Sequence, residues 1–159
     1  MKKTLLFVTF VFISLIIHAQ KFKTYYDNGN FKIIGEKENG KDTGEWKFYD
    51  ENGRISKIGT YKNGNKTGEW KYFHKNGVLR IIGKYDDDKD IREWKYYHDN
   101  GALWAIGSYN NGKAIGNWRY YHKNGTLSKF GKKENGKYTG TWKYYDENGT
   151  LSKTENLKR

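Results

Sequence analysis

The chain of 159 residues is strongly basic, with 30 lysine and arginine residues against 18 aspartate and glutamate residues and a formal net charge of +12, which suits either an acidic partner or simple solubility. The absence of cysteine excludes disulfides, thiol catalysis and cysteine-based zinc sites. The absence of proline suits continuous β-sheet, where a proline would remove a ladder hydrogen bond.

The first predicted element is a secretory signal peptide over residues 1–19. Two lysines follow the initial methionine, residues 5–17 are apolar, and His18-Ala19-Gln20 comes next. A basic start, an apolar run and a small residue before a polar stretch are typical of such a leader. The run is shorter than the roughly 20 residues that a membrane-spanning helix needs. We therefore expect cleavage near Ala19 and export to the periplasm, the cell surface or the medium.

From residue 20 to residue 159 the sequence repeats every 24 residues. Tryptophan marks the period, and an Asn-Gly pair follows six residues after each of these tryptophans. Phe22 takes the tryptophan position of a first, incomplete copy. The chain therefore holds about five full units and a partial cap, and a repeat of this length indicates units that bury their apolar faces against their neighbours.

Each unit is predicted to contain two β-strands. In one unit, residues 70–75 form an aromatic-rich strand, Asn76-Gly77 forms a two-residue turn with positive φ at both positions, and residues 78–85 form the returning strand. A second Asn-Gly pair closes most units, at Asn39-Gly40, Asn63-Gly64, Asn111-Gly112 and Asn135-Gly136. The sequence thus predicts an all-β fold: an elongated, single-layer antiparallel meander of stacked hairpins with about 10 to 12 strands.

The predicted turn also sets the register of each hairpin. It pairs Lys75 with Val78, His74 with Leu79 and Trp70 with Gly83. Each tryptophan thus lies opposite a glycine of its own hairpin, which we expect the indole to cover. The glycines that define the repeat are Gly53, Gly59, Gly77, Gly83, Gly101, Gly107, Gly125, Gly131 and Gly149.

Alternation along the strands places the tryptophans and the tyrosines that follow them on one face, which we expect to be the packed one. This aromatic ladder is the candidate binding or structural surface, and it comprises Trp46, Trp70, Trp94, Trp118, Trp142, Tyr72, Tyr96, Tyr120 and Tyr144. Trp104 is the one tryptophan out of phase. Alternation assigns it to the opposite, lysine-bearing face, where it anchors a ligand or covers Ile82.

One unit departs from the pattern. It has Asp86-Asp87-Asp88-Lys89-Asp90 in place of an Asn-Gly turn, and Arg92 replaces the glycine before Trp94. Acidic residues at 86, 88 and 90 match the first ligand positions of a calcium loop, but Ile91 and Tyr97 take the positions of its glycine and its bidentate glutamate. We therefore expect a solvated, looser turn.

Three histidines, His74, His98 and His122, occupy the same position in consecutive units. Equivalent positions two strands apart are separated by roughly 10 Å, whereas zinc ligands lie about 2 Å from the metal. We therefore expect each imidazole to form a hydrogen bond beside its turn. The sequence shows no catalytic triad, phosphate loop or isolated carboxylate pair, so it predicts no catalytic residue, no cofactor and no metal.

The pattern Gly68-x-Trp70, Asn76-Gly77-x-Leu79, Gly83-x-Tyr85 resembles the MORN repeat in its bacterial variant form. The resemblance covers residues 22–151, and the unit is similar to the repeat of antitoxin proteins of the YwqK type. It implies an elongated sheet of stacked hairpins and a role in binding rather than catalysis. It also implies three kinds of role, namely association with membranes, protein scaffolding and toxin neutralisation.

Together these features predict an exported, non-enzymatic scaffold whose partner is a protein of the cell envelope or the exterior. The alternatives are a module that binds glycan, cell wall or anionic lipid, and an antitoxin-like or immunity-like protein. Basic residues among aromatics also suit single-stranded nucleic acid, but export argues against that partner. Exposed edge strands would permit self-association.

Overall fold

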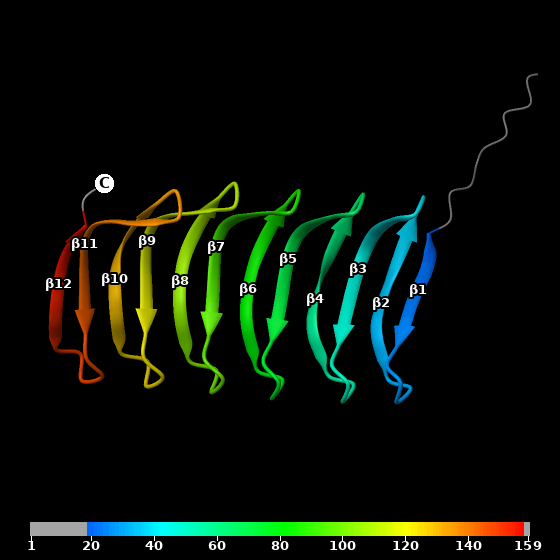
Figure 1. The fold of residues 1–159 in the computed structure, drawn as a ribbon, viewed down its shortest axis with the longest axis horizontal. Helices are drawn as coiled ribbons and strands as arrows, with labels where there is room; N and C mark the ends of the chain where they lie inside the picture. Colours follow the sequence, from blue (N-terminus) through cyan, green and yellow to red (C-terminus); the bar gives the residue numbers. More distant parts are fainter. Residues whose placement is uncertain (1–18, 158–159) are drawn as a thin grey trace, which may run out of the picture.

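The computed structural model describes residues 19–157, and they form one open sheet of twelve antiparallel strands paired in chain order (Figure 1). The strands are β1 (Gln20–Tyr25), β2 (Phe31–Glu38), β3 (Lys41–Tyr49), β4 (Ile55–Lys62), β5 (Asn65–Phe73), β6 (Leu79–Asp86), β7 (Lys89–Tyr97), β8 (Leu103–Asn110), β9 (Lys113–Tyr121), β10 (Leu127–Glu134), β11 (Lys137–Tyr145) and β12 (Leu151–Leu157). This confirms the predicted meander of stacked hairpins. The predicted signal peptide lies, except for Ala19, outside the described residues.

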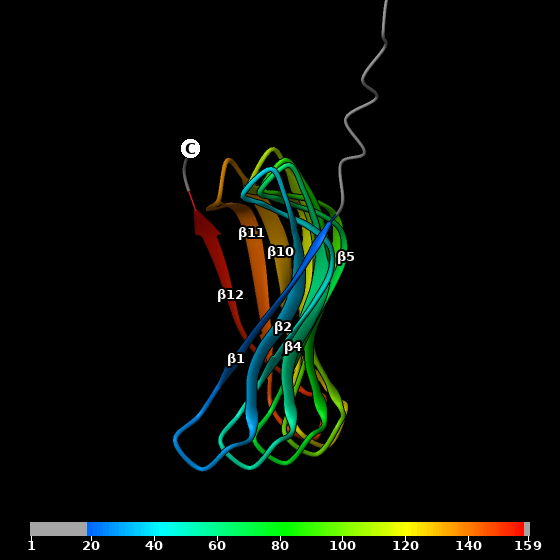
Figure 2. The same ribbon diagram turned by 90° about the vertical axis from the view of Figure 1, so that its right-hand side faces the viewer.

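The sheet is a single twisted layer, as the view along it shows (Figure 2). Within residues 19–157 the chain forms no helix long and apolar enough to cross a membrane. The core of this single layer consists of side chains stacked along one face, and the five repeat tryptophans form most of it. Since each hairpin contacts only its neighbours, stability is the sum of local terms along the array.

The turns at the two ends of the strands differ. At one end, two-residue turns such as Asn63-Gly64 have positive φ at both residues, 54° and 91°. At the other end, Gly77 N–H donates to the His74 carbonyl at 2.9 Å and His74 N–H donates to the Val78 carbonyl at 2.8 Å. This turn has a three-residue loop in which only the glycine has positive φ. The predicted two-residue turn at Asn76-Gly77 is therefore wrong.

A β-bulge restores the predicted register away from that turn. Phe73 pairs with Leu79, so the predicted His74–Leu79 and Lys75–Val78 pairs are wrong, but Tyr72 already pairs with Ile81. The longer loop shifts the pairing by one residue, and the extra residue Arg80 shifts it back. The predicted backbone pairs of tryptophan with glycine are therefore present, as Trp46–Gly59, Trp70–Gly83, Trp94–Gly107 and Trp118–Gly131. In the last hairpin Trp142 pairs with Glu155 instead of a glycine.

Each repeat indole covers a glycine of the preceding hairpin, so the prediction that it covers its own hairpin's glycine is wrong. A Cβ atom placed on Gly59 would lie 2.1 Å from a ring carbon of Trp70. Gly83 lies in the same way under Trp94, at 2.0 Å. The same contact joins Gly107 to Trp118, Gly131 to Trp142, and Gly35, which sequence reasoning missed, to Trp46.

The cause is a second irregularity, between the hairpins. Ile58 pairs with Lys71 and Thr60 pairs with Thr67, so Gly59 faces the three residues 68–70. Gly68 opens this bulge with a φ of 67°. The bulge brings the indole of Trp70 over the neighbouring strand β4. Each tryptophan is thus the joint between its own unit and the one before it.

The irregular unit adopts the same backbone as the others, so the prediction of a looser turn is wrong. Asp87 and Asp88 have φ values of 49° and 63°, and Arg92 has a φ of 60°. The Asp88 carboxylate accepts a hydrogen bond from the Lys66 amide at 2.8 Å. The indole N–H of Trp94 is buried without a hydrogen-bond partner, whereas the other four repeat tryptophans in the described chain donate to backbone carbonyls.

Candidate functional site

The predicted aromatic ladder separates into a buried part and a half-buried part. The five repeat tryptophans have exposed fractions of 0–3%, which leaves almost no ring surface for a partner. Tyr120 is buried as well, while Tyr72, Tyr96 and Tyr144 are half-buried. Tyr96 stacks on Trp94 at 6.4 Å and also contacts Trp118 at 6.2 Å, measured between ring centroids. The ladder as a whole therefore holds the array together.

Hydroxyl groups link the tyrosines within hairpins. Tyr72 and Tyr85 share a hydrogen bond of 3.0 Å, and Tyr96 and Tyr109 share one of 2.9 Å. Burial, and then the hydrogen bond from Tyr72, raises the pKa of Tyr85 well above its ordinary value. Burial and the bond with Tyr109 do the same to the pKa of Tyr96. These phenols stay neutral and help to close the packed face.

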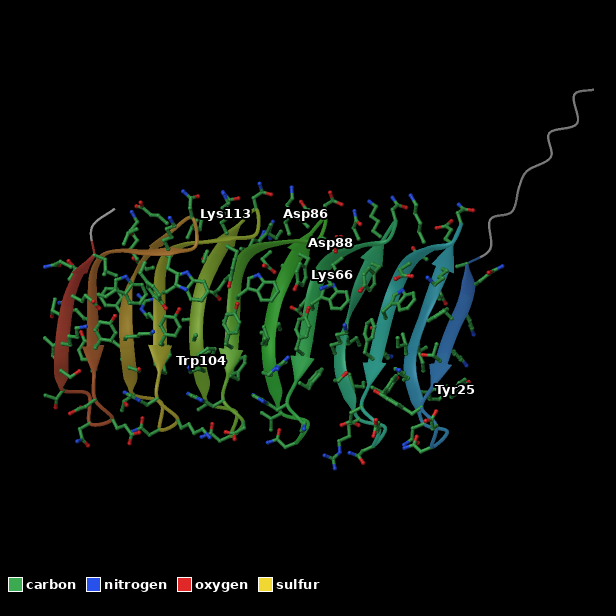
Figure 3. All side chains as sticks on the ribbon, in the orientation of Figure 1. Tyr25, Lys66, Asp86, Asp88, Trp104 and Lys113 are labelled. Carbon is green, nitrogen blue, oxygen red and sulfur yellow. The ribbon has the colours of Figure 1, made fainter. Side chains whose placement is uncertain are left out.

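Trp104 is the exception, because its side chain is 45% exposed. It lines a groove of about 540 Å³ that crosses β6, β7 and β8. The other lining residues are His74, Arg80, Ile81, Tyr96, Tyr97, His98, Asp99 and Lys123. Figure 3 shows Trp104 in the half of the sheet nearer the three-residue turns, far from Asp86 and Asp88 at the opposite ends of the strands. The groove is the candidate site.

Trp104 lies on the packed face, so its predicted place on the lysine-bearing face is wrong. Its indole contacts Tyr96, Tyr120 and His98, with ring centroids 5.9, 6.1 and 6.5 Å apart and with T-shaped geometry in each case. The reason is the β-bulge: Tyr97 pairs with Leu103 and Tyr96 pairs with Ala105, which leaves Trp104 as the extra residue. Simple alternation fails at such a residue.

The bulge position recurs in every hairpin, where it is occupied by Lys32, Ser56, Arg80, Trp104, Ser128 and Ser152. Two of the serines have a visible structural role. Ser56 Oγ donates to the Phe48 carbonyl, and Ser152 Oγ donates to the Tyr144 carbonyl, each at 3.1 Å. The arginine and tryptophan side chains make no such bond. These two adjacent units therefore lack the hydrogen bond from this side chain to a backbone carbonyl, and they place large side chains beside the groove.

One cationic side chain at the groove has an ion-pair partner and another has none. Lys123 Nζ lies 2.7 Å from the Asp99 carboxylate, and its hydrogen bond holds the pKa of that carboxyl below the usual value. Arg80 is exposed and forms no hydrogen bond or ion pair with any residue of the range 19–157. The groove therefore presents one uncompensated guanidinium group next to an exposed indole.

The histidines beside the groove bind backbone. Nε2 of His74 donates to the Tyr97 carbonyl at 2.9 Å, and His98 donates in the same way to Tyr121 at 3.0 Å. His122 repeats the contact with Tyr145 at 3.0 Å. The predicted hydrogen bonds beside the turns are confirmed, and each one connects a hairpin to the next. In the part of the chain that the structure describes, no group of three or more His, Asp or Glu side chains could hold a metal ion.

A second cluster near the C-terminal end gives a useful contrast, and sequence reasoning missed it. Nζ of Lys133 lies 4.2 Å from the Trp118 ring centroid and 4.8 Å from that of Tyr138. Lys129 lies over Tyr120 at 4.5 Å. Burial, and then the neighbouring Lys129, lowers the pKa of Lys133, although Tyr138 opposes this shift. Here lysine stems cover the rings, as amphipathic side chains do on apolar surface, whereas no lysine of residues 19–157 lies over the Trp104 ring in this way.

The comparisons with known proteins agree with the repeat architecture. The family model described as MORN repeat variant matches residues 42–63, 66–87, 93–111 and 138–159, which is more than half of the chain. The unmatched segment between the third and fourth matches contains β9 and β10, which continue the same sheet. A comparison with curated proteins finds no match. The chain belongs to the MORN repeat variant family.

Proposed function

We propose that the protein is an exported, non-enzymatic scaffold that binds another protein at the cell envelope or outside the cell. The observation that carries the proposal is the division of its tryptophans. Five are buried as joints between units, while Trp104 is exposed in a groove. A repeat array of this kind offers an extended, rigid surface for binding, and membership of a repeat family that serves as a binding scaffold supports the same role.

The absence of catalysis is part of the proposal. The three repeated histidines donate to backbone carbonyls and thus have a structural use. The acidic side chain that lines the groove, Asp99, is likewise engaged, since it pairs with Lys123. Export rests on the leader-like composition of residues 1–19. Cell fractionation, with the mass of the purified chain, tests this part: a mature chain that begins near Gln20 supports it, and an intact chain in the cytoplasm contradicts it.

The central experiment is affinity capture from cell-envelope extract, with a tag at the C-terminus so that a leader can be removed. Bound protein, glycan and lipid are identified at low and at high salt. We expect one protein to remain bound at high salt. Retention of wall polymer or lipid alone, released by free sugar or by salt, contradicts the proposal.

A glycan-binding module is the second candidate, because an exposed indole flanked by polar side chains also suits the face of a sugar ring. It predicts that soluble wall fragments shift the NMR signal of the Trp104 indole N–H. It also predicts that free sugar competes with capture.

A further inference from the structure

We propose that the Trp104 groove is the docking site for an acidic segment of a partner protein, which inserts an apolar side chain against Trp104 and pairs a carboxylate with Arg80. This inference rests on the proposed scaffold function and adds the surface and the chemistry of the partner. Four features of the structure support it.

The first feature is the exchange at the bulge position. The array tolerates serine there, and two of these serines bind backbone carbonyls. Arg80 and Trp104 occupy the same position in neighbouring hairpins, without that bond. Because serine also fits this position, the fold does not require arginine or tryptophan there. We therefore assign these two side chains to binding at the surface.

The second feature is the geometry of the groove. Arg80 lies on β6 and Trp104 on β8, on either side of β7, and Tyr96, the cross-strand partner of Ile81, lies on the strand between them. Equivalent positions two strands apart are separated by roughly 10 Å. An extended peptide covers this distance in about three residues, at about 3.3 Å per residue. We therefore expect the carboxylate about three residues from the apolar anchor.

The third feature is the charge. Of the two cationic side chains with long stems that line the groove, Arg80 has no hydrogen-bond or ion-pair partner among residues 19–157, while Lys123 is already paired with Asp99. An arginine binds a carboxylate through two parallel hydrogen bonds. The formal net charge of +12, which becomes +10 without Lys2 and Lys3 of the predicted leader, further favours approach of an acidic segment. Tryptophan, tyrosine and arginine are also the residues that dominate protein–protein hot spots.

The fourth feature separates a protein segment from a polymer or a membrane. A glycan chain or a lipid surface presents the same group many times and would be matched by a repeated slot. The bulge position is instead occupied by Lys32, Ser56, Arg80, Trp104, Ser128 and Ser152, so one arginine and one tryptophan stand alone. A single pair of anchors suits a single short segment.

The test is a selection of random twelve-residue peptides, displayed on phage, against the full protein. We expect the selected peptides to share an aromatic or aliphatic residue with Asp or Glu about three positions away. Trp104→Ser and Arg80→Ser should each weaken the synthetic peptides at least tenfold. Both variants place in the groove the residue that the array itself uses, so they should keep the wild-type fold, as judged by the circular dichroism spectrum and a cooperative unfolding transition.

Two matched controls complete the design. Tyr138→Ser removes an exposed aromatic side chain elsewhere on the same face and should leave peptide affinity unchanged. Replacing the acidic residue of the peptide by its amide should weaken binding to the wild type but not to Arg80→Ser. The inference is overturned if no peptide is enriched, if the peptides bind Trp104→Ser as well as wild type, or if only anionic vesicles or wall fragments shift the Trp104 indole signal.

A failure of the groove inference can be distinguished from a failure of the scaffold proposal. An envelope protein captured equally by wild type and by Trp104→Ser leaves the scaffold intact and refutes the groove. Capture of wall polymer alone refutes the scaffold, whatever the peptides do.

Discussion

Residues 62–73 and residues 86–97 are equivalent segments of two neighbouring units, and they reach the same backbone with different residues. The first uses Asn63-Gly64 in its turn and Gly68 before its tryptophan. The second has Asp87-Asp88 and Arg92 at those positions, with φ values of 49°, 63° and 60°. The first segment has residues suited to left-handed backbone, and the aspartates of the second also adopt it, whereas Arg92 resists it.

The difference shows that stacking overrides local preference. The joint of Trp94 on Gly83 and the strand pairs on both sides of β7 hold Arg92 in a conformation that it would avoid alone. Arg92 lies on β7, the strand that also carries Tyr96 and Tyr97 of the groove. Departures from local consistency are expected at functional sites. The comparison therefore yields three predictions, from the largest expected effect to the smallest.

Removing a joint should have the largest effect, and more so in the regular unit. Trp70→Ala should lower the free energy of unfolding by about 3–5 kcal/mol, as for other large aromatic truncations. Trp94→Ala should cost about 1 kcal/mol less, because the Trp94 indole N–H has no hydrogen bond to lose, whereas that of Trp70 donates to the Thr60 carbonyl at 3.1 Å. Urea denaturation of both variants measures the difference, and equal losses would contradict the comparison.

Relieving the strained residue should stabilise the irregular unit. A non-glycine residue in left-handed conformation costs roughly 1–2 kcal/mol, and the greater freedom of glycine in the unfolded chain offsets about 0.4–1 kcal/mol of that. Arg92→Gly should therefore add about 0.5–1 kcal/mol, seen as a higher denaturation midpoint with an unchanged slope. The mirror variant Gly116→Ala, at φ 69° with open space around the new Cβ, should destabilise. A destabilising Arg92→Gly would mean that the arginine side chain stabilises this unit.

Alkaline pH should weaken the tyrosine pairs beside the irregular unit. Burial and the bonds with Tyr72 and Tyr109 raise the folded-state pKa values of Tyr85 and Tyr96. The unfolded chain ionises near pH 10 and the folded chain does not. Their contribution to stability is therefore complete below about pH 10 and is lost as the pH rises above it.

Melting temperatures between pH 8 and pH 11 measure this loss. The double variant Tyr85→Phe, Tyr96→Phe should show a smaller decline above about pH 10 than the wild type. Exposed Tyr25→Phe is the control and should keep the wild-type slope. An unchanged decline in the double variant would assign the effect to other groups. Burial lowers the pKa of Lys57, which acts in the opposite direction, because loss of its proton with rising pH favours the folded chain.

The period, the strand order and the pairing of tryptophan with glycine could be predicted from sequence, because aromatic strands and Asn-Gly turns recur at fixed spacing. The pairing was correct although the turn was not, since the extra loop residue and the bulge at Arg80 cancel. The direction of the indole could not be predicted, because register tells which backbones face each other and not the strand over which a ring leans. The bulge at Gly68 decides that direction.

The site was visible in sequence only as an irregularity. Trp104 is out of phase with the other tryptophans, and the structure places it in the groove. Its face was wrong because alternation assumes a strand without bulges. Arg80 was not predicted as a site residue, although a comparison of the bulge position across the hairpins would have distinguished it from the serines.

Glu155 distinguishes the last described hairpin from the others. It occupies the position of the glycines that accept an indole, and its carboxylate instead accepts a hydrogen bond from Tyr144 and lies 3.2 Å from Lys153 Nζ. A second copy that added its β1 beside β12 would have to seat Phe22 where this carboxylate lies. The free backbone of β12 can thus be present without inviting head-to-tail growth of filaments.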